Sequence, residues 1–139
     1  MVDVQRLPQV LRAYMSVYGI DAGAIRQDGR LALTFDGRWR VQVRPLADGR
    51  CVLVALVMEL RQLPEIRADD VLVRLGQYAS GLIRDHRSTL AMDEGGDRLL
   101  LQQVLEADPT LPQLEEALGD FVNVLAFWNR TSQMEAAGR

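Results

Sequence analysis

The chain has one cysteine, one histidine and no lysine among its 139 residues. A single cysteine cannot form an internal disulfide, and Cys51, which stands among valines and leucines, is expected to be a core residue. The histidine, His86, lies at an expected helix end with no second histidine, cysteine pair or glutamate at ligand spacing, so no metal site is predicted. The arginines are scattered, and the net charge is −3 with a pI of about 5.1. This balance argues against a nucleic-acid partner, because phosphate binding needs clustered cations.

Long hydrophobic runs are also missing. The longest nearly uncharged apolar run, Cys51–Met58, is far below the ~18 to 20 residues of a membrane-spanning helix, so no membrane partner is predicted. The first residues contain no basic region followed by an apolar stretch, and we expect a cytoplasmic protein. The exclusive use of arginine is typical of a GC-rich bacterial genome. The length predicts one domain over residues 1–139, with a frayed tail from about residue 133.

Catalytic motifs are absent as well. The sequence contains no P-loop, no GxGxxG after a strand and no nucleophile elbow. Acidic pairs occur at Asp69-Asp70, Asp93-Glu94 and Glu115-Glu116. Two of them fall in the first turns of expected helices, where carboxylates interact favourably with the helix dipole. The sequence therefore predicts no enzyme, no catalytic residue and no cofactor.

The period of the apolar residues separates helices from strands. Between Leu7 and Tyr18 it is 3.6, which predicts a helix that Gly19 ends. It then changes to 2 over Leu31–Phe35 and Trp39–Val43, with Asp36-Gly37 between the two runs. An Asp-Gly between alternating runs predicts a hairpin, because both central residues of a type I′ turn need positive φ.

The hairpin continues into a three-stranded meander and then a helix. Asp48-Gly49 leads into a third strand, Cys51–Leu60. After Pro64, Asp69 or Asp70 can cap a helix that runs to about Asp85. Small residues in this middle helix, namely Gly76, Ala79, Ser80 and Gly81, indicate the close approach of another backbone, or a bend at Gly81.

A second hairpin and a last helix complete the chain. Ser88–Met92 and Arg98–Val104 form the hairpin. Thr110 and Gln113 form a capping-box pattern before a helix with a broad apolar stripe. The order α-β-β-β-α-β-β-α predicts an α+β fold, with an antiparallel five-stranded sheet and three helices. The first and last helices carry wide apolar faces, which indicate either a protein partner or a sheet that buries both.

Three stretches carry a family resemblance: Leu31–Gly37, Val52–Val57, and Leu101–Val104 followed by an amphipathic helix that ends near Trp128. From about Leu7 to Ser132 the chain resembles the class I type III secretion chaperones, the Tir-chaperone (CesT/SycE-like) family. The resemblance implies a cytoplasmic homodimer without catalytic activity. It also implies binding of the N-terminal chaperone-binding segment of a secreted effector, which stays competent for the secretion ATPase.

The resemblance and the residue pattern together suggest two surfaces. Members of the family pair mainly through the middle helix, which would place its small and apolar face in a dimer interface: Leu72, Leu75, Gly76, Ala79 and Leu82. Effector segments dock near the first helix and the sheet and can add a strand at a sheet edge. The predicted effector-binding residues are Leu11, Tyr14, Met15, Leu31, Leu33 and Phe35.

Two other functions stay open at this point. The same fold could serve a regulatory partner switch, or one half of a heterodimeric chaperone for a component of the secretion apparatus. A small-molecule-binding or enzymatic α+β domain is a third hypothesis, which the lack of convergent polar residues disfavours.

Overall fold

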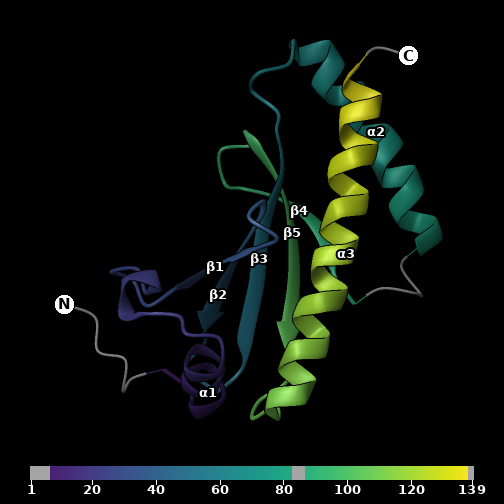
Figure 1. Cartoon of the computed structure of the whole chain (residues 1–139). Coiled ribbons are helices and arrows are strands. Elements are labelled where there is room, and N and C mark those ends of the chain that lie inside the picture. The colour runs from purple at the N-terminus through teal and green to yellow at the C-terminus, as the bar shows by residue number, and fades with distance from the viewer. Residues whose placement is uncertain (1–6, 83–86, 138–139) are drawn as a thin grey trace.

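The structure is a computed structural model that describes residues 7–82 and 87–137, except for the side chains of residues 80–82. Its elements follow the predicted order (Figure 1). The helices are α1 (Gln9–Val17), α2 (Glu65–Leu82) and α3 (Leu111–Ala136), with a short 3-10 turn at Ala22–Ala24. The strands are β1 (Leu31–Phe35), β2 (Trp39–Pro45), β3 (Cys51–Glu59), β4 (Thr89–Met92) and β5 (Arg98–Leu105). The α+β class and the five-stranded sheet with three helices are confirmed.

The strands form one antiparallel sheet in the order β1-β2-β3-β5-β4. Strand β1 is therefore at one edge and β4 at the other. On the outer side of β1 an isolated bridge joins Ile25 to Leu31, at the start of the strand. The short strand β4 pairs only with Leu99–Gln102 of β5. Each edge thus leaves part of a strand without a neighbouring strand.

The first hairpin has the turn that its sequence predicts. Asp36 and Gly37 have φ angles of 55° and 64°. The Arg38 N–H donates to the Phe35 carbonyl at 3.0 Å and closes the turn. This geometry fixes the register in which Leu33 lies opposite Val41. The predicted meander is confirmed.

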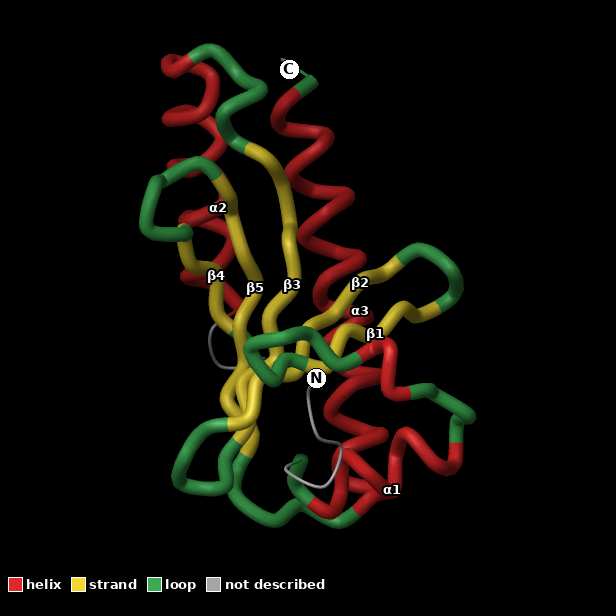
Figure 2. The backbone as a smooth tube through the Cα atoms, turned by 90° about the vertical axis from the view of Figure 1, so that its left-hand side faces the viewer, coloured by secondary structure: helices red, strands yellow, loops and turns green. Residues whose placement is uncertain are grey.

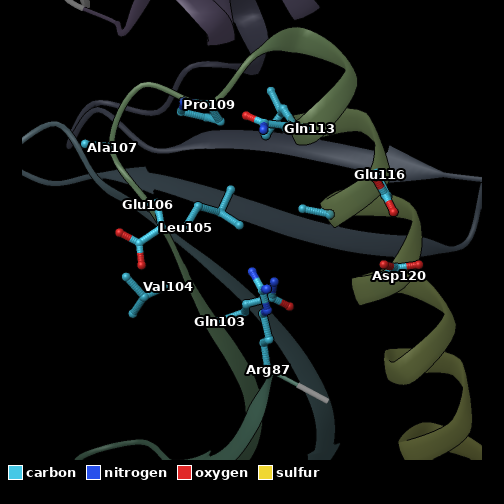
Figure 3. A pocket seen from close by; sticks show the side chains of 12 residues that line it. Arg87, Gln103, Val104, Leu105, Glu106, Ala107, Pro109, Gln113, Glu116 and Asp120 are labelled. Atoms are coloured by element: carbon cyan, nitrogen blue, oxygen red, sulfur yellow. The ribbon is translucent and has the colours of Figure 1, made fainter. Parts of the chain in front are cut away.

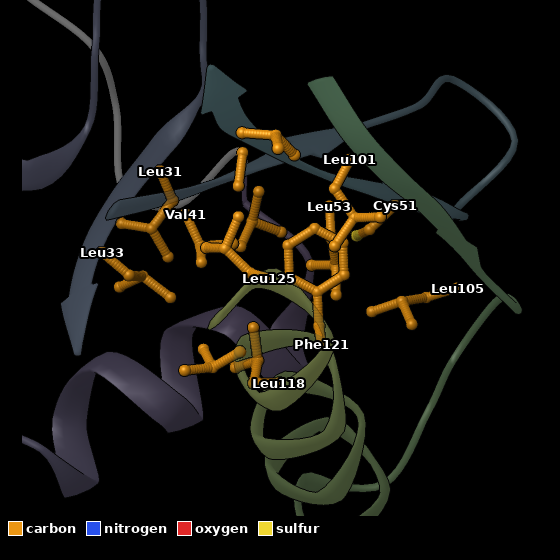
Figure 4. Packing of buried hydrophobic residues seen from close by; sticks show 14 of the residues in the cluster. Leu31, Leu33, Val41, Cys51, Leu53, Leu101, Leu105, Leu118, Phe121 and Leu125 are labelled. Atoms are coloured by element: carbon orange, nitrogen blue, oxygen red, sulfur yellow. The ribbon is translucent and has the colours of Figure 1, made fainter. Parts of the chain in front are cut away.

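The core lies between one face of the sheet and the helices α1 and α3. Leu53 of β3 and Leu101 of β5 are buried on this face, and the Phe121 ring of α3 points toward them (Figure 4). Burial alternates along β1, β2 and β3, as a sheet with one covered face requires. The core therefore forms a single cluster that spans the sheet and both terminal helices.

On the other face of the sheet, here called the open face, no helix of the described residues lies over the strands; Figure 2 shows β3 and β5 in front of α3. Val54 of β3 pairs with Gln42 of β2 and Gln102 of β5, and all three are only partly buried. The open face is apolar on β3 and β5, where Leu56 and Val104 are exposed. It is basic on β2, where Arg40 and Arg44 flank Gln42.

The predicted start of the middle helix was wrong. Helix α2 begins at Glu65, and Asp69 and Asp70 lie inside it rather than at its cap. The reason is that the helix starts directly after Pro64, whose carbonyl accepts from the Ala68 N–H at 2.9 Å. Proline fits this position, since it lacks an N–H that the first turn does not need.

Helix α3 also differs at its end. The capping box at Thr110 and Gln113 is confirmed, with both reciprocal hydrogen bonds present. The helix then continues to Ala136, so the tail expected from about residue 133 is helical up to that residue. Contacts from α2 stabilise these last turns: Arg67 donates to the carbonyls of Glu135 and Ala136 at 2.8 and 2.9 Å. Among the described residues no helix is long and apolar enough to cross a membrane.

Candidate partner-binding surfaces

A hollow of about 510 Å³ lies beside the outer edge of β1, and we call it the edge hollow. Its floor and walls come from the end of α1, from β1 and from the beginning of α3. Four consecutive residues of β1 line it, so both faces of the strand border the same space. The lining residues are Tyr14, Tyr18, Ile20, Ala32, Leu33, Thr34, Phe35, Asp36, Glu115, Leu118 and Gly119.

The edge hollow exists because small residues and an unpaired strand meet there. Gly119 is exposed on α3, and a Cβ atom built on it would meet no atom within 4 Å. The bridge between Ile25 and Leu31 covers only the start of the outer side of β1. In the part of the chain that the structure describes, no strand pairs with Ala32–Phe35 on this side. Unpaired strand edges are sites where an extended chain can add a strand.

Two tyrosines and a glutamate make the helix side of the edge hollow polar. The Tyr18 hydroxyl donates to Glu115 Oε2 at 3.0 Å, and this hydrogen bond raises the pKa of Tyr18. Burial is the main cause that raises the pKa of Tyr14, whose ring lies 4.6 Å from that of Tyr18. Both phenols are therefore protonated at neutral pH. The negative charge on this side is that of the Glu115 carboxylate.

The structure divides the six predicted effector-binding residues into two groups. Tyr14, Leu33 and Phe35 line the edge hollow. Tyr14 and Leu33 are themselves buried, at 6 and 5% exposed, so Phe35 is the most accessible of the three. Leu11, Met15 and Leu31 are buried in the core and do not line the hollow. The first helix uses its apolar stripe to pack on the sheet, so this stripe cannot also form an open groove. Sequence reasoning missed Tyr18 and Gly119, although a glycine inside a strongly predicted helix was a usable signal.

Helix α2 exposes part of the face predicted for dimerisation. Gly76 is exposed, and Leu72 and Ala79 are partly buried. Leu75 was predicted on this face, but it does not lie on the surface: it is 1% exposed and belongs to the core cluster. The side chain of Leu82 lies outside the described residues. Two further apolar residues, Ile66 and Val73, are 77 and 62% exposed on this helix. We call Ile66, Leu72, Val73, Gly76 and Ala79 the α2 surface.

A second hollow, of about 720 Å³, lies between the end of β5 and the first turns of α3. In Figure 3 the Arg87 side chain points into this space from below, while Glu116 and Asp120 border it from α3. Strand β4 ends its pairing at Gln102, so no described strand pairs with Gln103–Leu105 on this side. The lining is mixed in charge and contains no nucleophile next to a base.

Side chains that could act in catalysis or bind a metal do not cluster among the described residues. No group of three His, Cys, Asp or Glu that could hold a metal ion occurs among the described residues. Cys51 is 2% exposed, and burial raises the pKa of its thiol, so the nucleophilic thiolate is disfavoured. His86 lies outside the described residues. The arrangement offers surfaces for binding proteins.

Comparison with protein families agrees with this geometry. The family model of the Tir chaperone protein (CesT) family matches residues 9–129. This match spans the chain from α1 to nearly the end of α3. The chain belongs to the Tir chaperone (CesT) family.

Solved structures with a similar fold include members of chaperone complexes. One chain in the crystal structure of the ExsC–ExsE complex has a TM-score of 0.70 at 22% identity, covering 94% of this chain and 96% of that one. A chain of the HopA1–SchA chaperone–effector complex has 0.69 at 14%, covering 94 and 99%. A chain of the ExoU–SpcU complex from the type III secretion system of Pseudomonas aeruginosa has 0.62 at 16%, covering 86 and 94%. A search of curated proteins found no match.

Proposed function

We propose that this protein is a type III secretion chaperone. It binds the N-terminal chaperone-binding segment of a cognate effector and keeps that segment extended, in a state that the secretion ATPase can accept. It works as a cytoplasmic homodimer without catalysis. The family membership supports the chaperone class, and the similarity to chains of chaperone–effector complexes supports an effector as the partner.

The observation that carries the proposal is the edge hollow beside the unpaired part of β1. An extended segment that pairs with Ala32–Phe35 gains main-chain hydrogen bonds. Every second side chain of that segment enters the hollow, where the partly buried side chains of Ile20 and Phe35 provide apolar contacts. Each buried leucine or isoleucine contributes roughly 1.5 to 3 kcal/mol before ordering costs. Binding should therefore persist in 1 M salt, where the screening length is about 3 Å.

Dimerisation is the second part of the proposal, and the α2 surface supports it. Ile66 and Val73 are large apolar side chains exposed on the same helix as Gly76. Exposed apolar residues that lie close together are typical of protein interfaces. A glycine on such a face lets a second helix approach closely, which a two-fold symmetric pairing of α2 with its copy requires.

The test fills the edge hollow without touching the core. A Gly119→Gln side chain would enter the space that an extended partner needs, while the change from glycine favours the helix by up to about 1 kcal/mol. We expect affinity for a partner segment to fall at least tenfold while thermal stability is kept or raised. The control is Gly119→Ala, which adds one methyl group and should leave binding nearly unchanged. The probes are N-terminal segments of proteins encoded beside the gene for this chain.

Equal affinity of the wild type and both Gly119 variants for a bound segment would contradict the placement of the binding surface. Failure of every neighbouring segment to bind would contradict the chaperone function itself. The readout is isothermal titration of each segment into the purified full chain.

A further inference from the structure

Two arginines on the open face are not used by the fold. Arg40 and Arg44 of β2 are exposed, and neither has an ion-pair partner among the described residues. A third arginine nearby, Arg30, differs because it pairs with Asp28 at 2.7 Å and donates to Gln42 at 2.7 Å. The positive charge on this part of the sheet is therefore only partly neutralised.

The residue between Arg40 and the edge of the sheet is small, whereas Arg44 follows Val43, the partner of Leu31, and so lies beside Arg30. Thr34 of β1 lies opposite Arg40, and Ala32 lies opposite Gln42. Both Thr34 and Ala32 also line the edge hollow. The long side chain of Arg40 can therefore extend outward over Thr34 toward the edge without meeting another large side chain of β1.

The other side of the same edge has the opposite charge. There the edge hollow carries the Glu115 carboxylate, which accepts from the Tyr18 hydroxyl. Asp36 is the second carboxylate in the lining, and most of the other lining side chains are apolar or aromatic. A strand added to β1 would thus have one face toward an apolar and acidic wall. Its other face would lie on the same side of the sheet as Arg40 and Arg44.

We propose that Arg40, with Arg44 adding to the positive charge of the open face, selects the register of the bound segment by attracting carboxylates on the outward face of that segment. The inference rests on the proposed function, and it names the chemistry of the segment: apolar residues alternate with Asp or Glu. An added strand lies roughly 4.8 Å from β1 and roughly 9.6 Å from β2. A glutamate of the segment that leans inward and the Arg40 side chain that leans outward over Thr34 close this gap.

Charged side chains can fix the register at this edge, because main-chain pairing alone does not. A slip by one residue turns every side chain of a strand to the opposite face. In the slipped register the carboxylates would enter the hollow beside Glu115, and the apolar residues would lie in solvent. The attraction of the carboxylates to the arginines of the open face and their repulsion by Glu115 in the hollow both favour the same register.

The experiment uses a random dodecapeptide display library as the probe. The library is selected against the immobilised full chain, against the double variant Arg40→Gln/Arg44→Gln, and against a control, Arg61→Gln/Arg130→Gln, that removes the same charge elsewhere. We expect the wild type and the control to enrich peptides with acidic residues at alternate positions. The first double variant should keep the apolar alternation and lose the acidic preference. A selected acidic peptide should bind it on the order of tenfold more weakly in dilute salt.

Each other result contradicts a defined part of the proposal. The wild type could enrich peptides in which apolar residues alternate but acidic residues are not preferred. This result would overturn the role of the arginines and leave edge pairing intact. An acidic bias equal on all three proteins would place the selecting charge elsewhere. If no protein enriches any peptide, edge pairing itself fails and the inference falls with it.

Discussion

The two ends of helix α3 are held by different kinds of contact. Its first half packs on the sheet through fully buried side chains, among them Leu114, Leu118 and Phe121. Its last turns lie beside α2, where the described contacts include polar ones. Arg67 donates to the last carbonyls, and Arg74 and Tyr78 reach the Glu135 carboxylate.

This difference divides the molecule into two regions, which we call the body and the arm. The body, made of the sheet with α1 and the first half of α3, contains nearly all of the core cluster. The arm, made of α2 and the last turns of α3, buries Val71 and Leu75 but leaves Ile66 and Val73 exposed. An arm that leaves apolar residues exposed gains stability if a second copy covers them, which is why we place the dimer interface there.

The largest expected effect is on the body. Phe121→Ala removes a fully buried ring at the centre of the core and should lower the free energy of unfolding by about 3 to 5 kcal/mol. Phe127→Ala is the matched control on the same helix, because Phe127 is only partly buried and should cost clearly less. Urea unfolding followed by circular dichroism measures both. Equal losses would contradict the division into body and arm.

The next effect concerns the arm and its proposed partner copy. Gly76→Glu should leave the monomer folded, since a Cβ at this position meets no atom within 4 Å. In the dimer it would bury an uncompensated charge and weaken association by about 3 kcal/mol, or more than a hundredfold. Gly76→Ala is the control and should stay dimeric.

Sedimentation velocity at micromolar concentration measures the association state of both Gly76 variants. A monomeric wild type under these conditions would show that the α2 surface does not pair with its copy.

The same division explains what the sequence could predict. Elements of the body were predicted nearly to the residue, because local signals define them: alternation in β1 and β2, the Asp36-Gly37 turn, and the Thr110 capping box. The start of α2 and the end of α3 were wrong, since each depends on contacts between segments far apart in the chain. The Arg67 hydrogen bonds to Glu135 and Ala136 leave no local signal in the sequence.

The candidate site was predicted less completely than the fold. The edge position of β1 followed from the meander, and Tyr14, Leu33 and Phe35 do line the hollow. Leu11 was assigned wrongly, because an apolar stripe on a helix does not reveal whether the sheet or a partner covers it. Gly119 stands out inside a predicted helix, but its place beside β1 follows only from the packing of α3.

A smaller effect is expected at Cys51, which lies in the body. Cys51→Ser places a hydroxyl in an apolar site and should lower stability by about 1 to 2 kcal/mol, without changing affinity for a partner segment. Because burial raises the pKa of the thiol, wild-type Cys51 should react with thiol reagents at pH 8 only as fast as the protein opens. Loss of partner binding by a fully folded Cys51→Ser variant would show that the thiol has a direct role.

The smallest effects on stability are expected in the arm, for substitutions of two arginines of α2. Arg67→Met removes two hydrogen bonds to the last carbonyls of α3, where a cation also interacts favourably with the helix dipole, and should cost about 1 kcal/mol. Arg74→Met removes an ion pair of 3.4 Å whose arginine side chain is 58% exposed, and should cost less than about 0.5 kcal/mol.

Hydrogen exchange of the amides in the last two turns of α3 measures the local change. Faster exchange in Arg67→Met alone would show that capping by Arg67 keeps these turns helical, whereas equal exchange in both variants would assign this role to apolar packing.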